Sequence, residues 1–96
     1  MDVEVGKILS ALRSANIFKD TLIITLADHG GWGDNHGFSN LACIYIPVIF
    51  TGPFVKKNYQ ITRYVNNRDV PVHALHALGV EKGKYMHGYV IEEIYE

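Results

Sequence analysis

The residues best suited to chemistry lie in one short stretch, Asp28-His29-Gly30-Gly31, which is followed by His36. A carboxylate and an imidazole on adjacent residues can both reach one divalent cation only where the backbone turns, and the two glycines permit that turn. The spacing from His29 to His36 is too wide for one helix face and suits a loop that returns to the same point. Spacing alone leaves two interpretations open, a metal site or a surface loop of hydrogen-bonded polar residues.

The element that precedes this stretch is an apolar, β-branched run over residues 21–27. It shows no alternation of apolar and polar side chains, which is typical of a strand buried on both faces in a parallel sheet. Ligands of open α/β sheets bind beyond the carboxyl ends of the strands. We therefore expect Asp28, His29 and His36 at a ligand-binding edge of an α/β fold.

Two helices and a second strand are predicted around this edge. Apolar residues recur at helical spacing from Asp2 and predict an amphipathic helix that ends near residues 14–16. Residues 43–51 predict a strand in which Pro47 must lie at the start or on an edge.

A further helix is predicted over residues 69–78, with Asp69 as its N-cap and Gly79 as its end. Residues 61–65 allow at most a short strand. His73 and His76 lie on this helix, and we expect both to be surface or half-buried residues without a role in the site.

Composition limits the class of protein. The chain has 96 residues, 48% of them hydrophobic and 20% charged, which fits one soluble globular unit. Its net charge of −1 provides no basic field for nucleic acid. The single cysteine, Cys43, excludes an internal disulfide, and we expect it to be buried and inert. The sequence shows no signal peptide or membrane span, and it assigns no compartment.

The order of several motifs resembles the C-terminal part of the alkaline phosphatase superfamily, in particular its sulfatase-like and type I phosphodiesterase/nucleotide pyrophosphatase branches. The motifs that carry the resemblance cover nearly the whole chain: residues 21–30 with Asp28-His29-Gly30, then His36-Gly37, then residues 46–53, then Asn67-Arg68-Asp69-Val70-Pro71, and finally Leu78-Gly79.

The resemblance implies an α/β/α sandwich that hydrolyses phosphate or sulfate esters, usually through two divalent metals and a hydroxyl nucleophile. Asp28 and His29 match the pair that ligates one metal, and His36 matches a histidine that ligates the other metal or holds substrate. A histidine at position 29 favours zinc or manganese over calcium and points toward phosphoester chemistry.

The family's nucleophile and its remaining metal ligands precede the matched segment, and this sequence contains no substitute for them. We therefore expect residues 1–96 to be a single fragment of a hydrolase domain, inactive alone, whose complete form acts on a small phosphate or sulfate ester. Two alternatives are a small metal-binding domain that stands alone, and a non-enzymatic fragment that self-associates through an exposed sheet edge.

Overall fold

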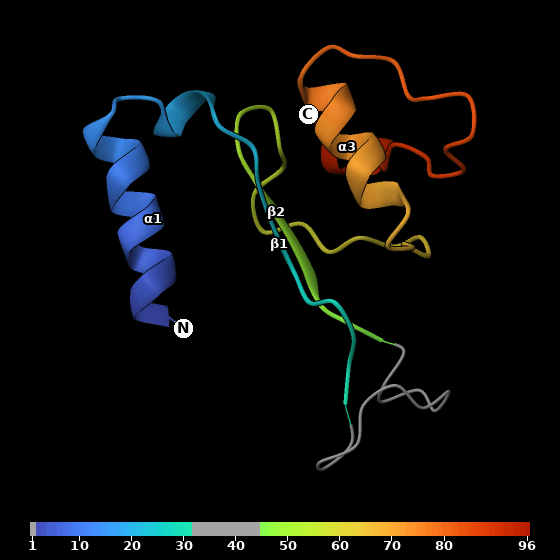
Figure 1. Ribbon diagram of the computed structural model, residues 1–96, viewed down its shortest axis with the longest axis horizontal. Helices are drawn as coiled ribbons and strands as arrows, with labels where there is room; N and C mark the ends of the chain where they lie inside the picture. The colour runs from blue at the N-terminus through green and yellow to red at the C-terminus, as the bar shows by residue number, and fades with distance from the viewer. Residues whose placement is uncertain (1, 32–44) are drawn as a thin grey trace.

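The computed structural model describes residues 2–31 and 45–96 (Figure 1). The elements run in the order α1 (Asp2–Ser14), the 3-10 helix η1 (Phe18–Asp20), β1 (Ile23–Leu26), β2 (Val48–Thr51), α3 (Asp69–Ala77) and the 3-10 helix η2 (Glu92–Ile94). This is a mixed α/β arrangement with a two-stranded sheet. Within the described ranges, every helix is too short or too polar to cross a membrane.

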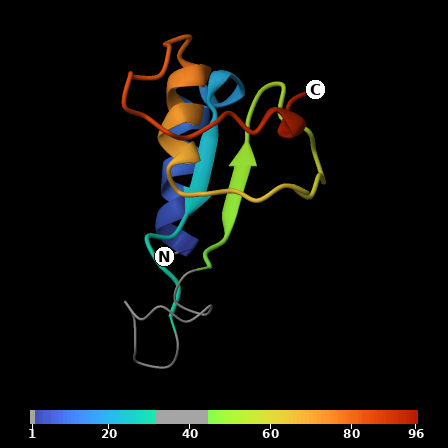
Figure 2. The same ribbon diagram turned by 90° about the vertical axis from the view of Figure 1, so that its right-hand side faces the viewer.

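The two strands lie side by side and run in opposite directions (Figure 2). Ile23 is opposite Thr51, and Leu26 is opposite Val48. The prediction of parallel pairing is therefore wrong for this pair. A parallel neighbour needs a crossover that returns the chain to the starting end of the sheet, whereas here the chain comes back directly alongside β1. The end of β1 and the start of β2 consequently lie at the same end of the sheet. β2 begins after Pro47, so residues 45–47 of the predicted strand 43–51 lie outside it.

The prediction that the first strand is buried on both faces is also wrong. Ile23 and Ile24 are half-buried, and Thr25 and Leu26 are exposed. The physical reason is that, among residues 2–31 and 45–96, β1 has one strand beside it and no layer over its second half. An apolar run shows that a strand can be buried, but a sheet of two strands offers too little surface to bury it.

The first helix has the predicted limits and ends in a Schellman motif. Asn16 adopts a left-handed φ of 58°, and the Ile17 amide donates to the Leu12 carbonyl over 3.1 Å. None of its residues is buried, and Ile8 on the predicted apolar face is 62% exposed. Figure 1 shows α1 standing apart from α3, joined to the sheet through η1.

The second helix, α3, ends in the same motif. Gly79 has a φ of 72°, and the Val80 amide donates to the Leu75 carbonyl over 2.9 Å. The predicted cap at its start is wrong, because Arg68 occupies the N-cap without a side-chain hydrogen bond and Asp69 is the first helical residue. The buried Asp69 carboxylate instead accepts the amides of Asn66 and Tyr89, each over 2.9 Å.

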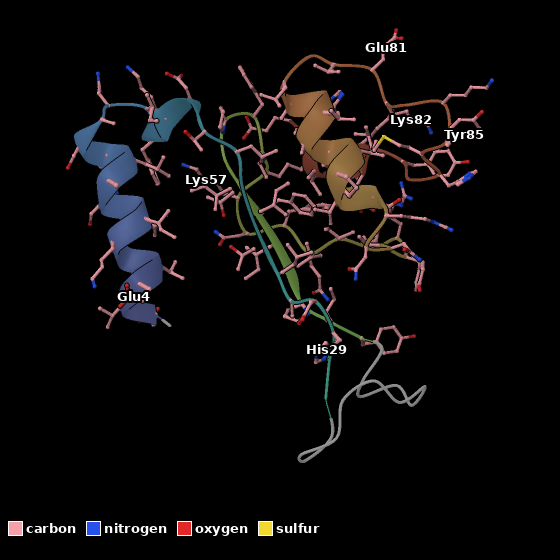
Figure 3. The ribbon with its side chains drawn as sticks, viewed as in Figure 1. Glu4, His29, Lys57, Glu81, Lys82 and Tyr85 are labelled. Carbon is pink, nitrogen blue, oxygen red and sulfur yellow. The ribbon has the colours of Figure 1, made fainter. Side chains whose placement is uncertain are left out.

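The core lies around α3 and the C-terminal segment, residues 91–96. Its buried apolar side chains are Val55, Val72, Ile91 and Ile94. An antiparallel bridge between Val55 and Tyr95 ties this segment to the loop after β2, and residues 61–65 form no strand. Figure 3 shows the side chains crowding between α3 and the strands, while those of α1 point into open space.

Candidate functional site

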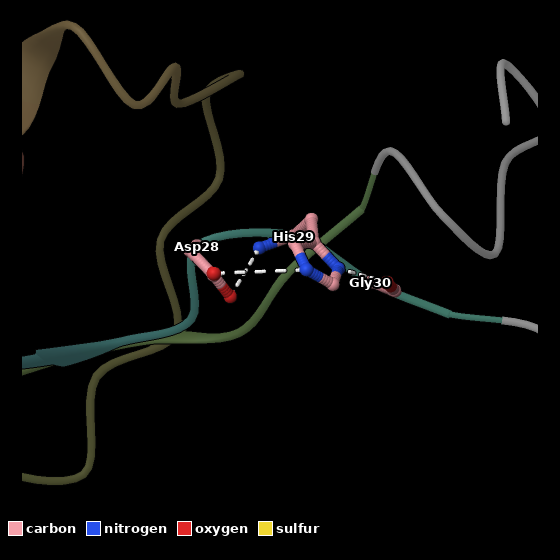
Figure 4. Close-up of polar contacts among 3 residues, drawn as sticks. All are labelled: Asp28, His29 and Gly30. Atoms are coloured by element: carbon pink, nitrogen blue, oxygen red, sulfur yellow. Dashed lines mark hydrogen bonds and ion pairs between the residues drawn. The ribbon is translucent and has the colours of Figure 1, made fainter. Parts of the chain in front are cut away.

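Asp28 and His29 follow directly after β1, where the chain leaves the sheet (Figures 3 and 4). Extended residues 23–26 carry the chain to the edge of the sheet, and the backbone turns there. The Asp28 side chain is 88% exposed and the His29 side chain 46% exposed. The amide of His29 donates to Asp28 Oδ1 over 2.9 Å, which fixes the carboxylate beside the imidazole.

The imidazole of His29 is oriented by the next residue. Its Nδ1 lies 2.7 Å from the Gly30 carbonyl oxygen, which can only accept, so the proton of the neutral ring is on Nδ1 (Figure 4). Nε2 then carries the lone pair, and it lies 3.6 Å from Asp28 Oδ2. A backbone carbonyl on the far ring nitrogen is the usual support for a metal-binding histidine.

Asp28 Oδ2 and His29 Nε2 suit a divalent cation both in their chemical type and in the distance between them. Two ligands of one tetrahedral zinc ion, bound at about 2.0–2.1 Å, lie about 3.3 Å apart. The observed 3.6 Å between Nε2 and Oδ2 is close to that separation. An anionic oxygen and a neutral imidazole nitrogen suit zinc or manganese.

His36, the third predicted ligand, lies outside the described residues, as does Cys43. In residues 2–31 and 45–96, no three His, Cys, Asp or Glu side chains come together in a cluster that could hold a metal. The structure therefore brings together Asp28 and His29, and the grouping with His36 stays a prediction.

A groove of about 540 Å³ lies along β2 and the loop that follows it, and neither Asp28 nor His29 lines it. Its wall includes the rings of Tyr45, Tyr59 and Tyr64. The groove and the Asp28-His29 pair are separate features of the molecule.

The prediction that His73 is a surface or half-buried residue is wrong. It has no exposed surface, whereas His76 is exposed as predicted. The Ile91 amide donates to His73 Nε2 over 2.6 Å, and Nδ1 lies 3.2 Å from the hydroxyl of Tyr95. The C-terminal segment folds back over α3 and covers this one histidine, which no local pattern in the sequence could indicate.

A second polar centre that sequence reasoning missed is Glu93. Its Oε2 accepts from the Tyr59 hydroxyl over 2.7 Å and from the amide and hydroxyl of Thr62 over 3.0 and 2.7 Å. Oε1 accepts from the Arg63 amide over 3.1 Å. These bonds, first that from Tyr59, lower the pKa of Glu93 from 4.5 to about 2. The same bond to the carboxylate raises the pKa of Tyr59.

Comparison with known proteins gives one consistent set of relatives. The chain is 29% identical over 93 residues to arylsulfatase K of the dog, Canis lupus familiaris, covering 92% of this chain and 17% of that protein. It is 28% identical to arylsulfatase K of Rattus norvegicus, covering 92% and 16%, and 28% identical over 74 residues to that of Gallus gallus, covering 72% and 14%.

This weak homology points to the sulfatase and alkaline phosphatase superfamily. The chain spans about a sixth of the length of the relatives it matches, 17% of the dog protein. No family model matches the chain. No solved structure matches it.

Proposed function

We propose that this chain is a segment of a metal-dependent sulfate-ester hydrolase, and that Asp28, His29 and His36 are its metal ligands. The observation that carries the proposal is the approach of Asp28 Oδ2 and His29 Nε2 to 3.6 Å at the exit of β1. Similarity to arylsulfatase K along 92% of the chain supports a sulfate ester as substrate. Because a histidine at position 29 points toward phosphoester chemistry, phosphodiesters are the second substrate class to assay.

Each residue of the pair has a defined task in this proposal. Asp28 supplies a negative charge and His29 a neutral nitrogen, and the Gly30 carbonyl holds the ring in the tautomer that leaves Nε2 unprotonated. A bound divalent cation would act as a Lewis acid on the non-bridging oxygens of the ester. Zinc or manganese suits this donor set better than calcium, which prefers ligands that are all oxygen.

We further propose that the segment belongs to an α/β/α sandwich and is inactive alone. The exposed apolar side chains of α1, with Val3 70% and Ile8 62% exposed, support a missing layer over this helix. The chain offers no counterpart of the family's hydroxyl nucleophile. We expect it to hydrolyse neither nitrophenyl sulfate nor bis(nitrophenyl) phosphate when zinc or manganese is added.

Calorimetric titration of the 96-residue chain with zinc, manganese and calcium chloride tests the ligand assignment. We expect one cation to bind, with Asp28→Ala and His29→Ala each abolishing the heat. His87→Ala is the matched control, because this exposed histidine lies in the C-terminal part of the chain and should leave the heat unchanged. Absence of heat from the wild type with all three cations, or heat from either ligand variant equal to that of the wild type, would refute the assignment.

A non-enzymatic, self-associating fragment is the second candidate. In the part of the chain that the structure describes, each strand of the sheet is paired on one side only, and unpaired strand edges pair readily with other chains. Sedimentation should then show a dimer or larger species at micromolar concentration. A monomer across the concentration range would exclude this candidate.

A further inference from the structure

His73 is a buried titratable group that the proposed site does not use. The imidazole has no exposed surface and lies between α3, β2 and the C-terminal segment. The ring centroid of Phe50, on β2, is 4.8 Å from that of His73. The Ile91 amide donates to Nε2 over 2.6 Å, and Ile91 is itself fully buried.

The hydrogen bonds of His73 require the neutral ring. A backbone amide can only donate, so Nε2 must accept and cannot carry a proton. The ring proton is then on Nδ1, 3.2 Å from the Tyr95 hydroxyl. Protonation of Nε2 would set two donors against each other at 2.6 Å inside the core, which removes the bond and leaves a buried amide without an acceptor.

We propose that His73 is a proton-operated latch, which holds Ile91 against α3 while the ring is neutral and releases it when Nε2 takes up a proton. The released stretch carries a core side chain, so opening also exposes the apolar surface of Ile91.

The charged and titratable groups that face His73 come from three parts of the chain: Asp69 and His76 from α3, Arg63 from the loop after β2, and Tyr95 from the C-terminal segment. Burial lowers the pKa of His73 below 6.5, His76 and Arg63 act in the same direction, and Asp69 opposes them. His73 Nε2 therefore binds a proton more readily in the open form of the latch than in the closed form. The neutral ring therefore favours the closed form in full above pH 6.5, and this preference weakens as the pH falls below that value.

Glu93 limits how much of the C-terminal segment can leave the core. Its carboxylate holds the next turn of the segment to Thr62 and Arg63, and it stays ionised down to a pH near its pKa of about 2. Mild acid therefore frees only the stretch around Ile91, while Tyr89 stays bound to Asp69 and η2 stays attached to the loop after β2.

Amide hydrogen exchange of the 96-residue chain, followed by NMR between pH 7.5 and 5.0, tests the latch. After correction for intrinsic exchange, the protection of the Ile91 amide should fall below pH 6.5, by up to about tenfold per pH unit for one proton taken up. The amides of Thr62 and Arg63, bound to Glu93, are internal controls and should keep their protection.

Two variants separate the latch from a structural histidine. His73→Gln retains a carbonyl acceptor that cannot be protonated, so Ile91 protection should become independent of pH. His87→Gln, at an exposed histidine that is not among the groups facing His73, should keep the wild-type pH response.

If His73→Gln does not fold, the ring ¹⁵N signals of wild-type His73 decide instead, since they should keep the Nδ1–H form below pH 6.5. The proposal is overturned if Ile91 protection in the wild type is independent of pH, if it falls equally in folded His73→Gln, or if the His73 ring takes up a proton without any fall in Ile91 protection.

Discussion

The N-terminal part of the chain, residues 2–31, buries none of its side chains, whereas residues 48–96 enclose the core. The first part is positioned by hydrogen bonds within α1, by η1 and by pairing with β2. The second part is stabilised by hydrogen bonds of Asp69, His73 and Glu93, each of which joins segments far apart in the sequence.

The proposed site and the side chains that stabilise the fold therefore lie in different parts of the chain. The Asp28-His29 pair is on the weakly buried part, so its side chains can change with little effect on unfolding. The C-terminal part supplies the packing that keeps β2 in place, and β2 in turn aligns β1 and the pair at its end.

The largest expected effect is that of Ile91→Ala. This side chain has no exposed surface, so truncation should lower the free energy of unfolding by about 2–5 kcal/mol. Ile8→Ala is the matched control, because Ile8 is 62% exposed and should change it by less than about 0.5 kcal/mol. Urea unfolding followed by tyrosine fluorescence measures both changes in free energy. Equal losses would refute the claim that residues 48–96 hold the core and residues 2–31 do not.

Gly88→Ala should have the next largest effect. A Cβ at this position would overlap the Arg68 carbonyl and would lie 2.9 Å from the Cα of Asp69. We expect a loss of about 1–3 kcal/mol of unfolding free energy, which is usual for overpacking. A Cβ on Gly83 would lie at an ordinary 3.5 Å from Met86 Sδ, so Gly83→Ala in the same unfolding assay should be near neutral.

Glu93→Gln should lower the urea midpoint at neutral pH, because an amide NH₂ would face hydroxyl and amide donors. The pKa of Glu93 falls from 4.5 to about 2 on folding, so the ionised carboxylate stabilises the fold above pH 4.5 and this stabilisation is lost as the pH falls toward 2. The midpoint difference between wild type and variant should shrink over that range. Glu92→Gln, an exposed neighbour, should show no such trend.

The smallest effect is a gain. Gly6 lies within α1 and nothing in the structure is within 4 Å of a Cβ placed there, so Gly6→Ala should stabilise the helix by up to about 1 kcal/mol. Far-UV circular dichroism should show higher helicity. Reduced helicity would mean that α1 packs more closely than the structure shows.

Sequence reasoning succeeded where the signal is local. Both helices and the presence of a strand after Pro47 follow from spacing, proline and glycine. It failed where the partner is distant, because the burial of His73 depends on Ile91 and the role of Glu93 on Thr62. The direction of strand pairing failed as well, since an apolar run can be a buried parallel strand or a half-covered antiparallel one.

The central claim is that the Asp28-His29 pair, and not the histidine-bearing C-terminal part, binds a divalent cation. NMR of the histidine side chains during zinc titration of the wild-type chain tests it directly. The account predicts that the ring signals of His29 shift and saturate at one equivalent, that those of His73, His76 and His87 stay in place, and that Asp28→Ala weakens the shift at least tenfold. If zinc shifts the signals of the C-terminal histidines first, or leaves those of His29 unchanged, the proposed cation site at Asp28 and His29 is refuted.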